Sequence, residues 1–249
     1  MQQRNINWFF LCIGLATLSG CDWLPGRPKE EDRWRPPEEN KNFADLYNTN
    51  CLACHGNDKI IAPSISMFNA TYVSIVPKEA LHKAIAQGIP GTMMPGYSAA
   101  AGGMLTDEQI NILVDGIAGL AKAKATAEAD HPEYAAAPGD AQRGAGAFAQ
   151  NCAQCHGNDG NGGKAGSVVE ASYLSLVSDQ YLRSVIIAGR PELGMPGYRE
   201  YVAGKPMTAE EIADVVGWLA SHRQGPAPGQ SAPPASTAAN TQNSQSNQQ

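Results

Sequence analysis

Two short motifs hold the residues of this chain that are best suited to chemistry. Residues 51–55 and 152–156 both read Cys-x-x-Cys-His. Two thiols three positions apart on one helical turn can form thioether bonds to the two vinyl groups of a haem, and the adjacent histidine can then bind the iron. The motifs therefore indicate covalent attachment of haem by four cysteines, with two histidines as iron ligands: Cys51, Cys54, Cys152, Cys155, His55 and His156.

Other chemistry is open to such thiol pairs. A lone Cys-x-x-Cys unit also occurs in thioredoxin-like redox sites and as half of a zinc site. Both motifs together could supply four thiolates to one zinc ion, but that site would leave two histidines without a role. It would also leave unexplained the methionines that follow each motif. Haem accounts for all of these residues.

Met94 and Met195 are the candidates for a second iron ligand on the opposite face of each haem. Each lies equally far from the histidine of its motif and is followed by Pro-Gly-Tyr. A thioether is a soft ligand that favours reduced iron, and a proline keeps the residue before it extended, which suits a loop laid across a haem. Met93 could compete in the first copy, but the register of the second copy favours Met94. The alternative is that both methionines fill ordinary cores.

The motifs belong to a unit that occurs twice. When the chain is aligned with itself, residues 51–58 match 152–159 and residues 94–97 match 195–198. Self-similarity at one fixed spacing indicates duplicated domains. Two copies do not indicate a solenoid, so we expect two tandem domains.

Helical periodicity surrounds the motifs in both copies. Apolar residues at helical spacing run from Phe43 into the first motif. Thr106 and Thr208 each begin a sequence typical of a capping box, with Gln or Glu three positions later. Each box opens an apolar stripe: Ile110, Leu113, Val114 and Ile117 in the first copy, and Ile212, Val215, Val216 and Leu219 in the second. No convincing alternation typical of strands occurs, so we expect small, all-α domains.

The composition divides the chain into six segments. We expect a signal peptide at 1–20, a lipidated N-terminus with a spacer rich in proline and charge at 21–40, the first domain at 41–123, a linker at 124–139, the second domain at 140–223 and a tail at 224–249. The tail has almost no large apolar side chains. It cannot bury enough surface to offset its ordering entropy, so we expect it to be disordered.

The N-terminus resembles an export signal that ends in a lipid-attachment site. Arg4 precedes an apolar run that is shorter than the roughly 20 residues needed to cross a bilayer. Residues 18–21 read Leu-Ser-Gly-Cys, which resembles a bacterial lipoprotein box and implies acylation of Cys21, and Asp22 resembles an inner-membrane retention signal. We therefore expect a lipid-anchored protein on the periplasmic face of the cytoplasmic membrane rather than on the outer membrane. The alternatives are an uncleaved anchor helix that reaches Leu24 and a chance thiol at Cys21.

Taken together, these residues resemble the class I cytochromes c, and in particular the tandem diheme electron-transfer cytochromes, here of bacterial lipoprotein type. The resemblance covers about residues 40–223 and implies two all-α domains, each wrapped around one covalent haem c. It also implies axial ligation of iron by His55 with Met94 and by His156 with Met195.

The two copies differ in how well they keep the family's helix crossing. In the second copy, Gly144 and Phe148 of the first helix would cross the last helix near Trp218, as in the family. In the first copy, Phe43 replaces the glycine and Gly116 stands where the tryptophan would align. The sequence therefore leaves open which residues pack at the helix crossing of the first copy.

The family also has a proline after the haem motif whose carbonyl orients the histidine. Pro63 is the candidate for this role in the first copy, whereas Lys164 occupies that register in the second. The partner of His156 is therefore left open. The other histidines are typical of surface residues and are weak candidates for iron ligands: His82, His131 and His222.

Electron relay, with no catalytic residue, is the expected function, because methionine would fill the sixth iron position. The expected partners are a quinol-oxidising complex, a terminal oxidase or a reaction centre, served by a tethered shuttle or a subunit of a respiratory or photosynthetic complex. The alternative is a small diheme enzyme of peroxidase or thiosulfate-oxidising type, which would need an open or unusually ligated iron. The net charge of −6 and the lack of a Lys/Arg run disfavour nucleic acid.

Overall fold

The computed structural model describes residues 29, 33–124 and 130–228. The expected signal peptide, Cys21 and all but the first residues of the expected tail lie outside this part. The contacts within the chain divide it into two units, with the boundary after Asn40. Before that point the described residues contain one turn of 3-10 helix, η3 (Pro37–Glu39), which opens on its proline. Within the described residues, no helix combines the length and apolar character required to span a bilayer.

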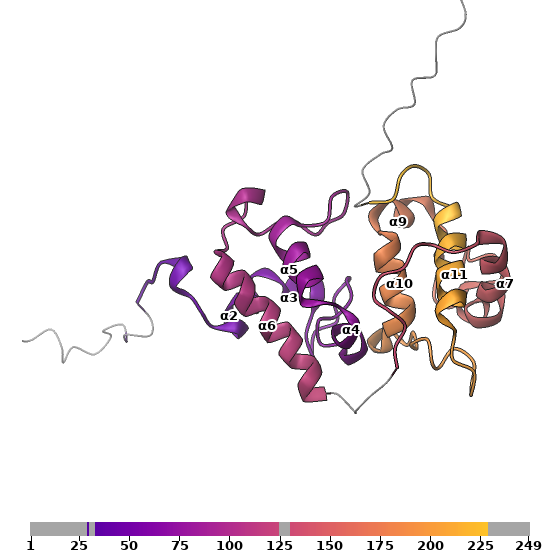
Figure 1. The fold of residues 1–249 in the computed structure, drawn as a ribbon, viewed down its shortest axis with the longest axis horizontal. Helices are drawn as coiled ribbons and strands as arrows, with labels where there is room; N and C mark the ends of the chain where they lie inside the picture. The colour runs from indigo at the N-terminus through magenta and orange to yellow at the C-terminus, as the bar shows by residue number, and fades with distance from the viewer. Residues whose placement is uncertain (1–28, 30–32, 125–129, 229–249) are drawn as a thin grey trace, which may run out of the picture. The chain divides into compact units, whose positions relative to one another are not determined.

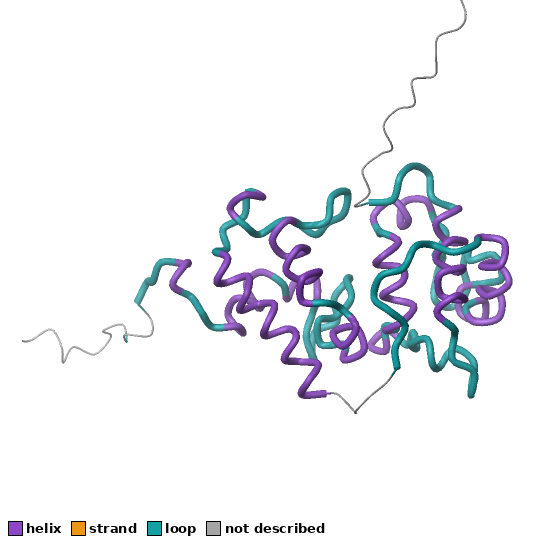
Figure 2. The backbone as a smooth tube through the Cα atoms, viewed as in Figure 1, coloured by secondary structure: helices purple, strands orange, loops and turns teal. Residues whose placement is uncertain are grey.

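The part from Lys41 onward is helical in both copies of the repeat (Figures 1 and 2). The first copy contains α2 (Phe43–Asn50), α3 (Leu52–His55), α4 (Ala70–Ile75), α5 (Lys78–Gln87), η4 (Ala99–Ala101) and α6 (Asp107–Lys124). The second contains α7 (Ala141–Asn151), α8 (Ala153–His156), α9 (Ala171–Leu176), α10 (Asp179–Ala188), η5 (Pro191–Leu193) and α11 (Ala209–Ser221). The described residues form two isolated β-bridges and no strand. The predicted all-α class is confirmed.

Both predicted capping boxes are present. The hydroxyl of Thr208 accepts the amide of Glu211 at 3.1 Å, and the carboxylate of Glu211 accepts the amide of Thr208 at 2.8 Å. Thr106 and Gln109 make the same reciprocal pair at 3.2 and 3.0 Å. Each pair satisfies amides that have no partner inside the helix, which explains why α6 and α11 begin where they do.

Each copy builds its own hydrophobic core around its last helix. The eight stripe residues predicted on α6 and α11 are all at most 5% exposed. The first core gathers apolar side chains of α2, α4, α5 and α6, and the second gathers those of α7, α9, α10 and α11. Burial of these stripes is the main force that orients each last helix toward its neighbours.

The crossing of α7 and α11 in the second copy follows the family pattern. A Cβ atom on Gly144 would lie 2.0 Å from the carbonyl oxygen of Asp214 and 2.7 Å from Cβ of Trp218. The rings of Phe148 and Trp218 pack with centroids 4.3 Å apart. Only glycine permits this close approach, so the predicted crossing is confirmed.

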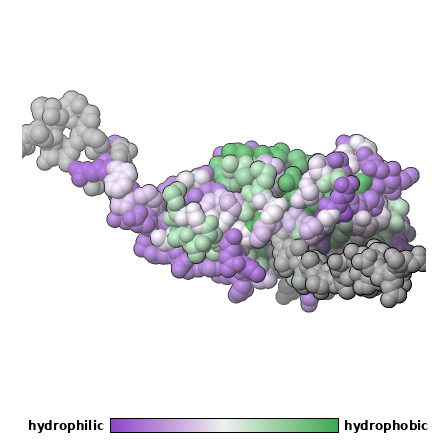
Figure 3. Space-filling model, turned by 90° about the horizontal axis from the view of Figure 1, so that it is seen from above, coloured by the Kyte–Doolittle hydropathy of each residue, from purple (hydrophilic) through white to green (hydrophobic). Residues whose placement is uncertain are grey.

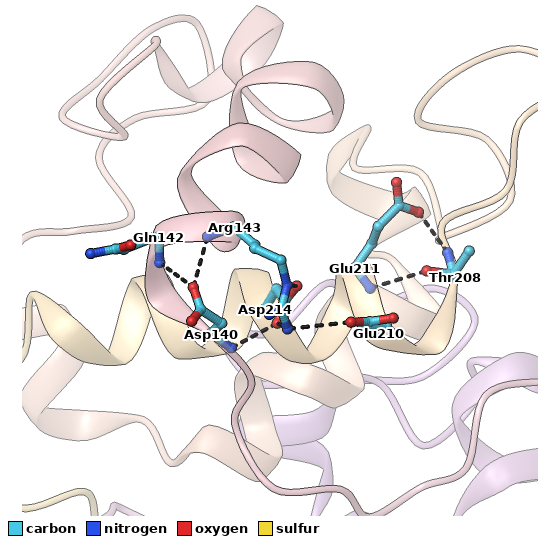
Figure 4. Close-up of polar contacts among 7 residues, drawn as sticks. All are labelled: Asp140, Gln142, Arg143, Thr208, Glu210, Glu211 and Asp214. Carbon is cyan, nitrogen blue, oxygen red and sulfur yellow. Dashed lines mark hydrogen bonds and ion pairs between the residues drawn. The ribbon is translucent and has the colours of Figure 1, made fainter.

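Polar contacts fix the start of α7 against α11 (Figure 4). Asp140 caps α7 by accepting the amides of Gln142 and Arg143. Arg143 forms a two-pronged pair with the buried carboxylate of Asp214, from Nε to Oδ2 at 2.8 Å and from Nη2 to Oδ1 at 2.9 Å. The Arg143 hydrogen bond holds the pKa of Asp214 below its ordinary value.

In the first copy, α2 and α6 cross in the same way, but the large and the small residue are exchanged between the two helices. A Cβ atom on Gly116 of α6 would lie 2.1 Å from Cδ2 of Phe43 on α2. The aromatic ring thus comes from the first helix and the glycine from the last, the reverse of the second copy. This exchange resolves the uncertainty that the sequence left, because one large and one small side chain fill a crossing in either order.

The linker and the start of the tail also make specific contacts. The carbonyl of Glu133 accepts Nε and Nη2 of Arg183 at 3.0 and 2.8 Å, and the amide of Gly139 donates to Ala213 at 2.7 Å. Beyond α11, Ala227 is only 7% exposed. Pro228 lies beside Gly91, where an added Cβ would be 3.4 Å away.

Contacts between α4 and α10 join the two copies within this unit. The side-chain amide of Asn69, which caps α4, donates to the carbonyls of Ala188 and Gly189 at 3.2 and 3.3 Å. Val185 and Ala188 of α10 belong to the first core, while Ile75 packs against the second. Side chains of each copy therefore also pack in or against the core of the other copy.

Candidate haem sites

Each Cys-x-x-Cys-His motif forms a single helical turn. The amides of Cys54 and His55 both donate to the carbonyl of Cys51, at 3.2 and 2.9 Å. In the second motif the corresponding distances to the carbonyl of Cys152 are 3.1 and 3.0 Å. The turn brings both thiols and the imidazole to one place, as attachment of a haem requires.

The first thiol of each pair, Cys51 or Cys152, has the character of a partly buried thiol rather than of a reactive thiolate, whereas Cys54 is exposed. None of the four cysteines is in a disulfide. Burial, with a smaller contribution from the neighbouring cysteine, raises the pKa of Cys51 to about 11 and that of Cys152 to about 12, whereas reactive Cys-x-x-Cys thiols have lowered values. Among the residues that the structure describes, no group of three or more His, Cys, Asp or Glu side chains is arranged to hold a metal ion by itself. The zinc alternative therefore gains no support.

Backbone carbonyls orient both histidine rings. Nδ1 of His55 lies 2.8 Å from the carbonyl oxygen of Ile65, and Nδ1 of His156 lies 3.1 Å from that of Gly166. A carbonyl oxygen only accepts, so Nδ1 carries the proton and Nε2 keeps its lone pair for a metal. Burial also lowers the pKa of His55, which favours the neutral, metal-binding form. Both rings therefore fit an iron of haem on their Nε2 side.

The expectation that Pro63 orients His55 is wrong. The acceptor is Ile65, two residues later, and the carbonyl of Pro63 instead accepts Nη1 of Arg190 at 3.0 Å. Gly166 fills the place that the sequence left open for His156. The acceptor in each copy lies ten residues after its histidine, so the register is conserved between copies although the residue type is not.

The loop that supplies this carbonyl is tied to the motif in the same way in both copies. The amide of Ser64 donates to the carbonyl of Cys54 at 2.9 Å, and that of Ala165 donates to Cys155 at 3.0 Å. In the second copy the backbone passes so closely that a Cβ on Gly163 would lie 2.4 Å from the carbonyl oxygen of Cys155. The glycines of this loop thus allow it to pack on the haem motif.

The two candidate methionines lie in loops that fold back on the preceding helix. Met94 and Met195 are both partly buried against apolar side chains, whereas Met93 is 81% exposed, which agrees with the preference for Met94. The amide of Ile89 donates to the carbonyl of Met94 at 3.0 Å. Arg190 and Met195 exchange two backbone hydrogen bonds of 2.9 and 3.0 Å. Ligation of iron by these sulfur atoms stays a prediction.

Glycines set the position of both methionine loops. Gly88 and Gly189 end α5 and α10 with φ of 72° and 68°. A Cβ would lie 2.6 Å from the amide nitrogen of Gly96 in the first copy and from the carbonyl carbon of Pro196 in the second. Both the left-handed backbone and the lack of space require glycine.

A tyrosine near each cysteine pair escaped the sequence analysis. The hydroxyl of Tyr97 donates to the carbonyl of Asn50 at 2.7 Å, and that of Tyr201 donates to Ile186 at 3.2 Å. Burial, and after it the nearby cysteines of the motif, raises the pKa of both tyrosines. The repeat aligns Tyr97 with Tyr198 instead, but the hydroxyl of Tyr198 donates to Asp130 in the linker. Alignment of the copies gave no signal for Tyr201.

Comparison with known proteins agrees with the motifs. The sequence model of the family described as "Cytochrome C oxidase, cbb3-type, subunit III" matches residues 38–115 and 139–219. Each matched region contains one Cys-x-x-Cys-His motif with its carbonyl loop. No curated protein sequence matches the chain.

A solved structure, the "Kuenenia stuttgartiensis reducing HAO-like protein complex Kustc0457/Kustc0458", is 16% identical in sequence. The match covers 77% of this chain and 100% of that chain, with a TM-score of 0.43. A likeness of this degree carries no functional argument. The two family matches together span more than half of the chain, and the protein therefore belongs to the cbb3-type cytochrome c oxidase subunit III family, whose members are c-type cytochromes with covalently bound haem c.

Proposed function

We propose that the protein binds two haem c groups and relays single electrons between membrane-associated redox complexes. The observation that carries this proposal is the matching arrangement of His55 and His156. Each ends a one-turn motif with two thiols and has Nδ1 fixed by a carbonyl ten residues further on. This match supports a second haem site rather than a decayed duplicate.

The residues have the following roles in this proposal. Cys51 and Cys54 attach one haem and Cys152 and Cys155 the other. His55 and His156 bind iron through Nε2, held in orientation by their carbonyl acceptors. Met94 and Met195 supply the opposite ligands from loops fixed at Gly88 and Gly189. Haem iron supplies one-electron chemistry, and with side chains on both faces it has no open position for a substrate.

The proposed setting is the periplasmic face of the cytoplasmic membrane, with acyl chains on Cys21 as the anchor. A tether would raise the effective concentration of the protein near membrane-bound partners. The family's name favours a terminal oxidase among the expected partners, alongside a quinol-oxidising complex or a reaction centre. On the face shown in Figure 3, apolar residues gather in a patch that polar residues surround. Met93 and Met104, on the segment that carries Met94, are 81% and 89% exposed. Such exposed apolar surface is typical of protein contact sites.

A spectroscopic count of haems tests the proposal on the purified full chain. We expect two haems per chain, both low-spin in the oxidised state, and no change of the reduced spectrum when carbon monoxide is added. High-spin iron or carbon monoxide binding in either domain would contradict the relay and would suit the enzymatic alternative. Purification after mild detergent extraction then distinguishes a shuttle, which leaves its partner, from a subunit, which remains bound to it.

A further inference from the structure

Arg190 is a charged residue in an unusual place. Its exposed fraction is only 6%, although arginines are almost never fully buried unless they are paired. It follows Gly189 and begins the loop that carries Met195, to whose backbone it is hydrogen-bonded in both directions. In the first copy the corresponding residue is Ile89, which makes the backbone contact to Met94 without any charge. The loop itself therefore does not require an arginine.

The guanidinium of Arg190 reaches from the second copy into the first. Nη1 donates to the carbonyl of Pro63 at 3.0 Å and Nη2 donates to that of Ala62 at 2.7 Å, while Nε pairs with Glu192. Two carbonyls held by one planar fork have a fixed position and direction. Because Glu192 balances the charge, the contact serves geometry rather than net electrostatics.

The carbonyls that Arg190 holds belong to the loop that orients His55. Directly after Pro63, the amide of Ser64 donates to Cys54, and the carbonyl of Ile65, two residues after Pro63, accepts Nδ1 of His55. Hydrogen bonds of Arg190, together with the short backbone segment from Ala62 to Ile65, therefore link the backbone of Met195 to the imidazole of His55. Asn69 adds a second contact between the copies, to the carbonyls of Ala188 and Gly189.

We propose that Arg190 is a positioning residue that locks the histidine loop of the first haem domain to the methionine loop of the second, and thereby fixes the arrangement through which electrons pass between the haems. The electron-transfer part of this inference rests on the proposed function, whereas the lock itself does not. The buried guanidinium of Arg190 holds the two loops in one geometry. Electrons would therefore pass between the two haems without the domains first having to dock.

Hydrogen exchange on the reduced full chain tests the lock. In Arg190→Met, the amide of Ser64 should exchange faster by about tenfold to a hundredfold, the change expected when hydrogen bonds from a charged donor are lost. The amide of Ala165 makes the same contact in the second copy that Ser64 makes in the first, and it should be unaffected. Arg190→Lys keeps the charge but loses the fork, so it should behave like Arg190→Met.

Arg183→Met is the matched control. Arg183 is also a buried arginine of the second copy, 3% exposed, but it donates to Glu133 in the linker. Its loss should leave the exchange of Ser64 unchanged. An effect of equal size in Arg183→Met, or wild-type exchange of Ser64 in Arg190→Met or Arg190→Lys, would overturn the lock.

Flash reduction of one haem, followed by relaxation to the other, tests the consequence. We expect the internal electron-transfer rate to fall about tenfold or more in Arg190→Met and not in Arg183→Met, in parallel with the exchange data. A faster exchange of Ser64 with an unchanged transfer rate would overturn the electron-transfer part alone. A protein with one haem, or with high-spin iron, would instead refute the proposed function, and the exchange data would still decide the lock.

Discussion

The histidines of the two Cys-x-x-Cys-His motifs are oriented by the backbone rather than by a particular side chain. Ile65 and Gly166 have nothing in common except their distance from the histidine and the loop that presents their carbonyls. Residue types could therefore not identify them, and the family's proline pointed to Pro63. Orientation of a ligand ring by a carbonyl also fixes its tautomer and increases its basicity, so the backbone path of this loop has a direct chemical consequence.

Replacement of Met94 tests the predicted sixth ligand. Met94→Leu keeps the volume of the side chain, with a cost to stability of less than about 1.5 kcal/mol, but removes the thioether. One of the two haems should become high-spin and bind carbon monoxide, and its reduction potential should fall by more than about 59 mV, a tenfold change for one electron. Met93→Leu is the control, and its spectrum should match the wild type. The reverse pattern would identify Met93 as the ligand.

Gly189 offers a test of how the methionine loop is held. Gly189→Ala should cost about 1–3 kcal/mol for a backbone with positive φ and extended ψ, and more for the clash of its Cβ with Pro196. Gly204→Ala has a similar φ of 72° but open space around its Cβ, so it should show the first cost alone. Urea unfolding gives both free energies. Equal losses would mean that the loop moves away freely and that the close approach is unimportant.

At the scale of the helices, the two copies reach the same crossing by opposite routes. The second copy places glycine on α7 and tryptophan on α11, and the first places phenylalanine on α2 and glycine on α6. Packing constrains the total volume at the crossing and not which helix supplies it. A motif search that requires the family's order therefore fails in the first copy although the contact is preserved.

Gly116→Ala tests this exchange. Its Cβ would overlap the ring of Phe43, and overpacking of this kind costs about 1–3 kcal/mol. Gly119→Ala, on the same helix with nothing within 4 Å of the added Cβ, should instead stabilise the protein by up to about 1 kcal/mol through helix propensity. Thermal or urea unfolding measures both. Stabilisation by Gly116→Ala would show that the Phe43 ring swings aside and does not define the crossing.

At the scale of the whole molecule, the two duplicated domains pack against each other. Residues of α10 complete the first core, and Arg190 and Asn69 bind backbone of the other copy. The linker is hydrogen-bonded to the second domain at both ends of its described part. The carbonyl of Asp130 accepts from Tyr198, and the amide of Gly139 donates to Ala213. Residues 41–228 thus bring the two haem motifs into one packed unit, while the anchor predicted at Cys21 would hold that unit at the membrane.

The lipid anchor is tested by Cys21→Ala. Each buried methylene of an acyl chain contributes about 0.8 kcal/mol to membrane binding, so loss of the chains should move the haem-stained protein from the membrane fraction to the soluble fraction. Cys12 lies before the expected cleavage site, so Cys12→Ala should leave the protein in the membrane fraction. Retention of the Cys21→Ala variant in the membrane would instead support an uncleaved N-terminal helix.

The sequence alone determined the haem motifs, the duplication, the capped starts of α6 and α11 and the apolar stripes that became the cores. These features are local or periodic, so neighbouring residues are enough to specify them. The tertiary structure decided the carbonyl partners of His55 and His156, the tyrosine beside each cysteine pair, the exchange of Phe43 with Gly116 and the reach of Arg190 into the other copy. Those contacts join residues far apart in the chain, and they depend on where the backbone passes rather than on which side chains it carries.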